Sequence, residues 1–197
     1  MSILYNVVRS LVALYYRALY FAGVEGKENI PSEGGFLLCA NHKSNNDPPF
    51  IASFLPRQMK FLAKKELFEV PVFGGIIRLL GAIPLNRGAS DTTAIKKSMQ
   101  IMRDGDGLMV FPQGHRRKTV ELKDIHPGSV AMAQRVGVPV VPVAVCGEYK
   151  LFRKMKLRIG KPVYTEELEQ LIEAADGDKN KAFAELIYDR IGSLVNE

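Results

Sequence analysis

The sequence predicts a single α/β domain in which a mixed sheet is flanked by helices. Short apolar runs alternate along the 197 residues with longer segments of helical periodicity, and this alternation is the pattern of a sheet covered by helices. Hydrophobic residues make up 47% of the chain, which is the proportion found in folded proteins. A chain of this length has room for one domain with a substantial core.

Residues 1–23 are expected to form a helix that lies in a membrane interface, ahead of a domain over residues 24–197. The segment is rich in aliphatic residues and tyrosine, but Arg9 and Arg17 interrupt it. Its charge-free stretches are shorter than the ~20 apolar residues that a spanning helix needs, and no signal-peptide cleavage site follows. Tyrosines and arginines among aliphatic residues are typical of an interfacial helix. A helix packed on the core is the alternative.

The strand expected at residues 36–40 leads into a polar loop that contains a histidine and an aspartate. Asp47 comes five residues after His42 and is followed by Pro48 and Pro49. A residue before proline is disfavoured in the helical region, so Asp47 is expected to cap a helix that begins at Pro48. The loop can also turn the carboxylate back to the imidazole, which would leave one ring nitrogen free to accept a proton. A loop histidine without a chemical role is the alternative.

The remaining elements follow from apolar runs, capping residues and stops at glycine or proline. Strands are expected at residues 59–63, 82–85, 108–111, 138–145 and 157–159. Helices are expected from Ser90 or Asp91 to Met102, from Pro127 to Arg135, over 165–175 from Thr165, and over 179–195 from Asp178.

Several strands end in polar loops whose side chains suit acid–base chemistry or anion binding. These side chains are His42 with Asp47, Arg87, and Arg116 with Arg117. In an α/β sheet, loops at the carboxyl ends of strands gather into one crevice. Arginine binds phosphate through two N–H groups, and Gly88 and Gly114 allow the backbone to approach a ligand. A general base beside a phosphate site, on a domain with an interfacial helix, suggests chemistry on a hydroxyl of a phosphorylated lipid precursor.

The charge of the chain is unevenly distributed. The net charge is +6, yet residues 1–160 carry 23 Lys and Arg against 12 Asp and Glu, whereas residues 161–197 carry 4 against 9. A basic body suits a membrane surface, a phosphorylated substrate or nucleic acid, with a solvated basic face as the alternative. The basic run at residues 116–118 has no interleaved aromatic residues and no nucleic-acid-binding motif, so nucleic acid is not an expected partner.

No metal or cofactor is expected from the sequence. The histidines His42, His115 and His126 lack the spacing of a metal site, and neither a P-loop nor a dinucleotide fingerprint is present. The cysteines Cys39 and Cys146 lie in apolar runs, which indicates small buried side chains rather than a disulfide. A nucleophilic pair of Cys39 with His42 is an alternative to the histidine acting as a base.

Four blocks of the sequence, in order between about residues 25 and 165, resemble the 1-acylglycerol-3-phosphate O-acyltransferases, the lysophosphatidic acid acyltransferase branch of the glycerolipid acyltransferases. The first is Asn41-His42 through Asp47-Pro48. The second combines Ala63-Lys64-Lys65-Glu66-Leu67 with residues 81–87, the third is Phe111-Pro112-Gln113-Gly114-His115-Arg116, and the fourth is residues 138–143. One block would be weak evidence, whereas four in order are specific.

The resemblance implies a peripheral (monotopic) enzyme on the cytoplasmic side of the cell membrane. It would move an acyl group from acyl-CoA or acyl carrier protein to the free hydroxyl of lysophosphatidic acid. His42 would be the base, oriented by Asp47. The implied phosphate-binding residues are Arg87 and Arg116, and the implied substrate-positioning residues are Lys64, Gln113 and Gly114. The alternatives are another acceptor, such as glycerol 3-phosphate or another lysolipid, or a non-catalytic domain that binds anionic lipid.

Two positions depart from the family pattern. Gln113 stands where the family usually has glutamate, and His115 stands where it has a small hydroxyl residue. Gln113 keeps a hydrogen-bond acceptor but loses the charge, so activity should survive if the glutamate acts by hydrogen bonding. His115 is either an extra phosphate contact, a second base or a positional variant. The apolar residues 70–80 are expected to belong to the core or to the wall of an acyl-chain pocket.

Overall fold

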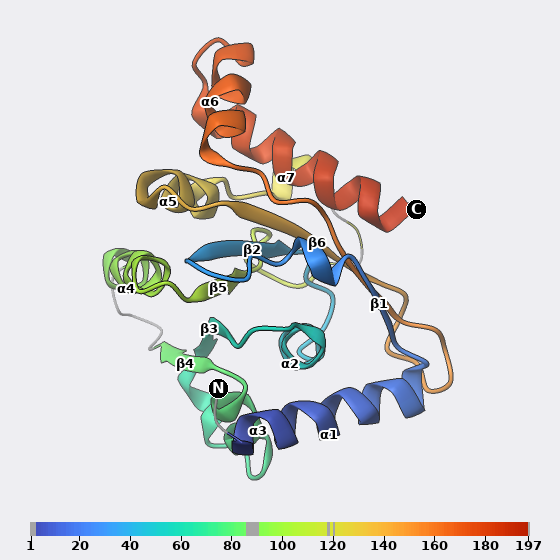
Figure 1. The fold of residues 1–197 in the computed structure, drawn as a ribbon. Coiled ribbons are helices and arrows are strands. Elements are labelled where there is room, and N and C mark those ends of the chain that lie inside the picture. Colours follow the sequence, from blue (N-terminus) through green and yellow to red (C-terminus); the bar gives the residue numbers. More distant parts are fainter. Residues whose placement is uncertain (1–2, 86–90, 118, 120, 197) are drawn as a thin grey trace.

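The computed structural model describes residues 3–85, 91–117, 119 and 121–196, and within them the chain forms a seven-stranded sheet (Figure 1). Its strands are β1 (Gly23–Glu25), β2 (Phe36–Ala40), β3 (Met59–Lys64), β4 (Ala82–Leu85), β5 (Gly107–Val110), β6 (Val140–Cys146) and β7 (Lys156–Ile159). The strand order is β1-β7-β6-β2-β5-β3-β4, and neighbours run parallel except for the antiparallel pair β6 and β7. The predicted α/β fold with a mixed sheet is confirmed.

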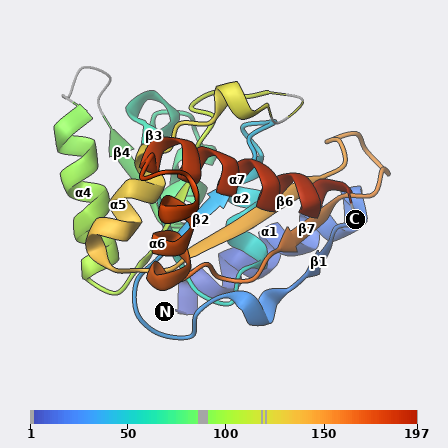
Figure 2. The same ribbon diagram turned by 90° about the horizontal axis from the view of Figure 1, so that it is seen from above.

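Helices cover both faces of this sheet. The α-helices are α1 (Ile3–Tyr20), α2 (Asp47–Phe54), α3 (Phe73–Leu79), α4 (Asp91–Arg103), α5 (Gly128–Val136), α6 (Thr165–Ala174) and α7 (Lys179–Asn196). Short 3-10 helices occur at η1 (Lys27–Asn29), η2 (Lys65–Phe68) and η3 (Leu122–Asp124). In Figure 1, α1, α2 and α3 lie below the sheet and α5, α6 and α7 above it, and Figure 2 shows α7 crossing over β6, which it contacts.

The central strand β2 is buried on both faces and separates two hydrophobic cores. Successive side chains of a strand point to opposite faces of the sheet. Phe36 and Leu38 therefore pack into the core beneath α1, α2 and α3, whereas Leu37 and Cys39 pack into the core beneath α4, α5 and α7. Because helices cover the side chains on both faces of β2, the loop after β2 emerges from a rigid part of the molecule.

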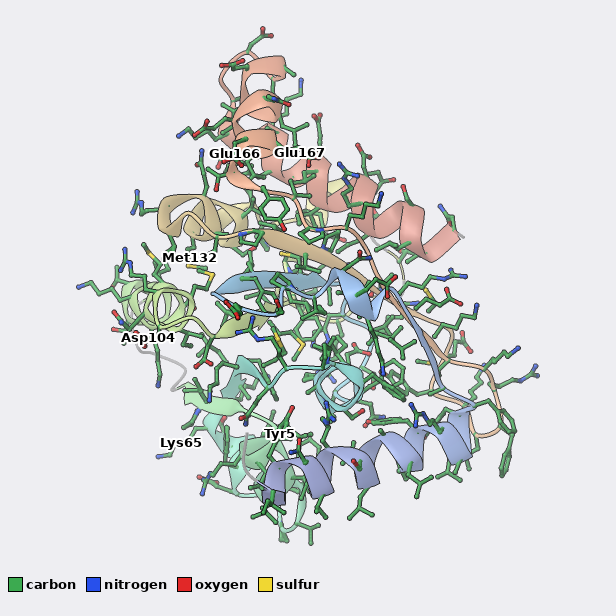
Figure 3. The ribbon with its side chains drawn as sticks, viewed as in Figure 1. Tyr5, Lys65, Asp104, Met132, Glu166 and Glu167 are labelled. Atoms are coloured by element: carbon green, nitrogen blue, oxygen red, sulfur yellow. The ribbon has the colours of Figure 1, made fainter. Side chains whose placement is uncertain are left out.

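Helix α1 packs against the domain with one face and exposes an apolar face on the other side. Tyr5, labelled in Figure 3, is 2% exposed, whereas Ile3 is 84% exposed. The two arginines that interrupt the segment bind α2 and its end: Arg9 donates to the carbonyl of Leu55 at 2.6 Å, and Arg17 lies over the ring of Phe54. No helix in the described part of the chain is both long enough and apolar enough to cross a membrane.

Most predicted elements lie within one or two residues of their observed limits. Strand β6 begins at Val140 rather than Val138, because it follows Pro139, which has no N–H to contribute to a ladder. The strand β1 and the helix α3 were not predicted. Helix α4 begins at Asp91, while the alternative cap residue Ser90 lies outside the described residues.

The expected cap at the start of α2 is wrong. Asp47 is the first helical residue, the preceding position is Asn46, and no side chain caps this end. A capping side chain accepts from the N–H groups of the second or third helical residue. With Asp47 as the cap, these residues would be Pro49, which has no N–H, and Phe50, whose N–H donates to the carbonyl of Asn46 at 2.9 Å. The Asp47 carboxylate therefore has no capping partner in its own helix and turns back into the preceding loop.

Candidate active site

The loop between β2 and α2 folds around the carboxylate of Asp47. One oxygen, Oδ2, accepts from the backbone N–H of Lys43 at 2.6 Å and of Ser44 at 2.7 Å, and lies 2.9 Å from Nδ1 of His42. The other oxygen, Oδ1, accepts from the hydroxyl of Tyr149 at 2.8 Å. Asp47 is fully buried, so its carboxylate has lost its hydration shell. These hydrogen bonds take the place of the lost water.

The imidazole of His42 is fixed on several sides. Its ring stacks on that of Phe111, with centroids 4.1 Å apart. Its backbone N–H donates to Oε1 of Gln113 at 3.0 Å, and its carbonyl accepts from the N–H of Arg117 at 2.8 Å. The carboxylate at Nδ1 favours the neutral tautomer with its proton on that nitrogen, which leaves Nε2 as a proton acceptor. This geometry suits a general base.

His42 lines a cavity of about 540 Å³ that has both polar and apolar walls. Its polar side chains are Asn45, Lys64, His115 and Arg116. Its apolar side chains include Phe61, Leu67, Phe73, Ile77 and Met109. A cavity of this size and composition can hold an anionic group and a hydrocarbon segment beside one imidazole.

The structure places most of the predicted site residues at this cavity. Arg116, Lys64 and Gly114 line it, and Gly114 has a φ of +69°, a backbone conformation that glycine adopts without strain. Arg117 does not line it, since its guanidinium points to Asp124 at 3.4 Å. The predicted phosphate-binding residue Arg87 and the neighbouring residue 88 lie outside the described residues.

Gln113 is buried beneath the site and does not line the cavity. Its side chain is 1% exposed; Oε1 accepts from the His42 N–H, and Nε2 donates to the carbonyl of Thr119 at 3.1 Å. Gln113 therefore joins the base-carrying loop to the loop after β5 through two main-chain groups. A glutamate at this position would keep the first contact and lose the donor for the second.

Cys39 is not placed to act with His42. Its thiol is fully buried in the core beneath α4, α5 and α7, on the face of β2 opposite to that of Ala40. Burial raises the pKa of Cys39 to about 12, so the thiol remains protonated and unreactive near neutral pH. The alternative of a cysteine nucleophile is therefore wrong.

Two structural partners of the site were not predicted. Asn41 pairs with both backbone groups of Val145, at 3.1 Å and 2.7 Å, and so ties the end of β2 to β6. Tyr149 reaches Asp47 from the loop after β6, 102 positions away in the sequence. No local pattern indicates contacts over such a separation, so only the fold reveals them.

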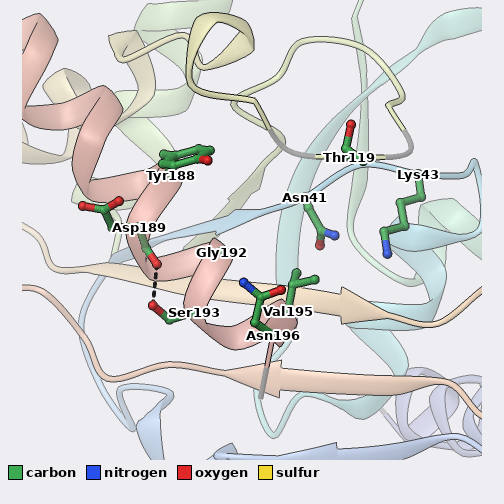
Figure 4. A pocket seen from close by; sticks show the side chains of 9 residues that line it. All are labelled: Asn41, Lys43, Thr119, Tyr188, Asp189, Gly192, Ser193, Val195 and Asn196. Atoms are coloured by element: carbon green, nitrogen blue, oxygen red, sulfur yellow. Dashed lines mark hydrogen bonds between the residues drawn. The ribbon is translucent and has the colours of Figure 1, made fainter.

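A second cavity, of about 500 Å³, lies between the end of α7 and the loops after β2 and β5 (Figure 4). Its lining comprises Asn41, Lys43, Thr119, Tyr188, Asp189, Gly192, Ser193, Val195 and Asn196. The His42 imidazole is not part of this lining, so the first cavity is the candidate active site. Among the described residues, no group of three or more His, Cys, Asp or Glu side chains is placed to hold a metal ion.

Comparison with known proteins agrees with this site. A family model described as Acyltransferase matches residues 22–146, which carry the His42 loop and the cavity walls. A 1-acyl-sn-glycerol-3-phosphate acyltransferase of Bacillus subtilis (strain 168) is 31% identical over 180 residues, covering 88% of each chain. The chain belongs to the 1-acylglycerol-3-phosphate acyltransferase family. The resemblance of the four sequence blocks is thereby confirmed.

Other members of this acyltransferase family differ in length from the chain. A relative of Streptococcus pneumoniae is 28% identical over 176 residues, which are 85% of this chain and 65% of that protein. A chloroplastic relative of Arabidopsis thaliana is 31% identical, covering 67% of this chain and 38% of its own. The crystal structure of the 1-acyl-sn-glycerophosphate acyltransferase PlsC from Thermotoga maritima matches with a TM-score of 0.69 and 28% identity, covering 93% of this chain and 79% of that one.

Proposed function

We propose that the protein transfers a fatty acyl group from a thioester donor, acyl-CoA or acyl carrier protein, to the free hydroxyl of lysophosphatidic acid, giving phosphatidic acid. The observation that carries the proposal is the His42–Asp47 pair at a cavity with both cationic and apolar walls. Lysophosphatidic acid combines a phosphate, a hydroxyl and a hydrocarbon chain, which match these three features. The printed names of the relatives support the same acceptor.

In the proposed reaction Nε2 of His42 takes the proton of the acceptor hydroxyl as its oxygen attacks the thioester carbonyl. The tetrahedral intermediate collapses with cleavage of the C–S bond, and the imidazolium returns the proton to the leaving thiolate. Asp47 holds Nδ1–H throughout. Positioning of two substrates supplies up to about 7–11 kcal/mol of the barrier, and the base adds about 10²- to 10⁴-fold. No covalent acyl-enzyme is required.

The phosphate of the acceptor is proposed to bind Arg116, with Lys64 as a second cation on the cavity wall. Both side chains line the cavity that contains His42. Guanidinium groups bind phosphate through paired N–H donors, whereas lysine contributes a compact point charge. Arg87 is retained as a proposed phosphate ligand on the family resemblance of its sequence block. The apolar walls would accommodate hydrocarbon.

We also propose that the protein binds peripherally to the cytoplasmic face of a membrane through the exposed face of α1. The apolar residues on this face include Ile3, Leu4, Val7, Leu11 and Leu14, each at least 50% exposed. Two apolar tips, Val72 and Phe152, are also exposed and have φ angles of +62° and +59°. A positive φ costs residues other than glycine on the order of 1–3 kcal/mol each. Strained residues tend to occur at functional sites, and Val72 and Phe152 expose apolar side chains there. This supports a contact of both residues with lipid.

Purified protein mixed with acyl-CoA and lysophosphatidic acid tests the proposed reaction. Free thiol and phosphatidic acid should appear together, and His42→Ala should lower kcat by about 10²- to 10⁴-fold, because the general base is lost. His126→Ala removes an exposed histidine that does not line the cavity and serves as the matched control. Both variants should retain the melting temperature.

The acceptor and donor are resolved in the same assay. Product with glycerol 3-phosphate but none with lysophosphatidic acid would replace the proposed acceptor. Absence of thiol release with either acceptor, from either acyl-CoA or acyl carrier protein, would favour a lipid-binding domain without catalysis. Near-normal turnover by His42→Ala would remove the base from the mechanism while leaving the reaction itself in place.

A further inference from the structure

We propose that Tyr149 is a positioning residue for the His42–Asp47 pair: its hydroxyl holds the Asp47 carboxylate in the orientation that serves the base. This inference rests on the proposed function, because it assigns a role within the same site. Tyr149 lies in the loop between β6 and β7, outside the four sequence blocks that carry the family resemblance.

The two oxygens of Asp47 are held from different parts of the chain. The donors at Oδ2 are the imidazole and two backbone N–H groups, all within the five residues that precede Asp47. Tyr149 donates to Oδ1 at 2.8 Å and is 102 positions away. A carboxylate held at only one oxygen can turn about its bond to Cβ, and a second donor at the other oxygen prevents that rotation. Tyr149 therefore fixes the plane of the carboxylate, and with it the direction in which Oδ2 meets Nδ1.

The ring of Tyr149 is itself held in place by aromatic neighbours from α1 and α2. It meets Phe50 edge to face at 5.9 Å, Tyr20 edge to face at 5.9 Å, and Tyr16 at 6.3 Å. Such contacts are the favoured arrangements of aromatic pairs. The hydroxyl is thus aimed at Asp47 by packing that does not depend on the hydrogen bond, so removing the hydroxyl should leave the ring in position.

The hydroxyl remains a donor over the working pH range. Burial, together with the negative charge of Asp47, raises the pKa of Tyr149. The neutral phenol therefore keeps its proton near neutral pH and presents no second negative charge to the carboxylate there. A constant donor of this kind stabilises one orientation of Asp47 without competing for the proton that the imidazole carries.

The proposal is tested first with Tyr149→Phe, which preserves the ring and removes the hydroxyl. A hydrogen bond to a charged group is among the stronger ones in proteins, so kcat should fall about tenfold while KM for lysophosphatidic acid stays the same. The matched control is Tyr20→Phe, which removes a hydroxyl from the same aromatic cluster but no donor to Asp47. This control should retain kcat, and both variants should keep the melting temperature within a few degrees.

A double-mutant cycle separates positioning from packing. In an Asp47→Asn background the charged partner is gone, so Tyr149→Phe should change the residual kcat far less than it does in the wild type. An equal loss in both backgrounds, or wild-type kcat for Tyr149→Phe alone, would overturn the assignment.

The Nδ1–H proton resonance of His42 provides a readout that needs no turnover. Tyr149→Phe should shift or broaden this resonance, and Tyr20→Phe should leave it unchanged. If acyl transfer itself is absent, the resonance still decides the role of Tyr149, so failure of this inference and failure of the proposed function give different results. An unchanged resonance in Tyr149→Phe would contradict the proposal.

Discussion

At the residue scale, Gln113 holds two main-chain groups through hydrogen bonds that need no charge. Its amide accepts from one main-chain group and donates to another, in a position that is 1% exposed. A buried amide that satisfies both partners carries no desolvation cost for a net charge. In this structure Thr119 offers a carbonyl, which needs the N–H donor of an amide. The departure from the glutamate of the family pattern is therefore compatible with an intact site.

Substitutions at Gln113 should separate stability from turnover. Gln113→Glu keeps the acceptor for His42 N–H but leaves the Thr119 carbonyl unpaired, so unfolding free energy should fall by about 1–3 kcal/mol with little change in kcat. Gln113→Leu removes both contacts and should lower stability and kcat together. Chemical denaturation and steady-state assays measure the two effects. A large rise in kcat for Gln113→Glu would show instead that the site requires a negative charge.

Arg116 offers a second test at this scale. Arg116→Ala removes a guanidinium from the cavity wall and should raise KM for lysophosphatidic acid about tenfold, with little change in kcat, because a charged hydrogen bond to the phosphate is lost. Arg117→Ala is the matched control, since its guanidinium points to Asp124 and its backbone N–H, which binds His42, is retained. Equal effects of the two substitutions would argue against a phosphate contact at Arg116.

The residues of the site differ in how far sequence could predict them. His42 and Asp47 were predictable as a pair because five positions of one loop separate them. The cap assigned to Asp47 was wrong because Pro49 has no N–H to donate and the N–H of Phe50 donates to the carbonyl of Asn46. The role of Gln113 depends on where Thr119 and His42 lie in space, and no spacing along the chain encodes that position.

At the scale of elements, α1 has a packed face and an exposed apolar face. One face packs on α2 and α3, while the opposite face remains apolar and exposed. The helix α3 was missed because it is seven residues long and contains Gly74 and Gly75, which disfavour helices. A Cβ at Gly74 would lie 2.3 Å from the carbonyl oxygen of Phe68, so close packing on η2 requires the glycine that local propensity opposes.

The exposed face of α1 should control binding to lipid. A fully buried leucine contributes about 1.5–3 kcal/mol, so Leu11→Ser combined with Leu14→Ser should weaken binding to vesicles at least about tenfold. The matched control is Ile95→Ser with Tyr164→Ser, which removes exposed apolar side chains from other elements. Flotation with vesicles of phosphatidylcholine and phosphatidic acid measures binding, and thermal unfolding verifies the fold. Unaltered flotation of the α1 variant would contradict the proposed membrane contact.

At the scale of the whole molecule, the acidic excess is concentrated in the last two helices. The acidic segment 161–197 forms α6 and α7, and Figure 3 shows Glu166 and Glu167 at the end of the molecule opposite to α1. The basic excess belongs to residues 1–160, which contain α1 and the cavity. Under the proposed membrane contact, the acidic helices would be turned away from an anionic surface.

Salt should therefore weaken association with anionic vesicles more than with neutral ones. The screening length falls from about 10 Å at 0.1 M salt to about 3 Å at 1 M, so long-range attraction to the surface is lost as salt increases. Binding to vesicles that contain phosphatidic acid should decline toward the level of pure phosphatidylcholine vesicles, whose binding should change little. A flat salt response on anionic vesicles would show that apolar contact alone holds the protein.

The architecture as a class was predictable, whereas the arrangement of its strands was not. Apolar runs and turn residues indicate where strands occur, because both are local properties. The order of the strands depends on pairings between distant segments, such as β1 with β7, and the three residues of β1 carry too little pattern to be recognised.

The compactness of the loop that carries the base has a consequence for how this enzyme can diversify. His42 and Asp47 are contained in one short segment, while much of the apolar wall of the cavity comes from β3, η2 and α3, whose described residues do not contact this pair through a hydrogen bond. Mutations in those walls can reshape the space offered to the acyl chain without rebuilding the proton-transfer unit. On the proposed function, the volumes of Phe73 and Ile77 are expected to influence the preferred chain length, and exchanges at these positions should leave the His42–Asp47 pair in place.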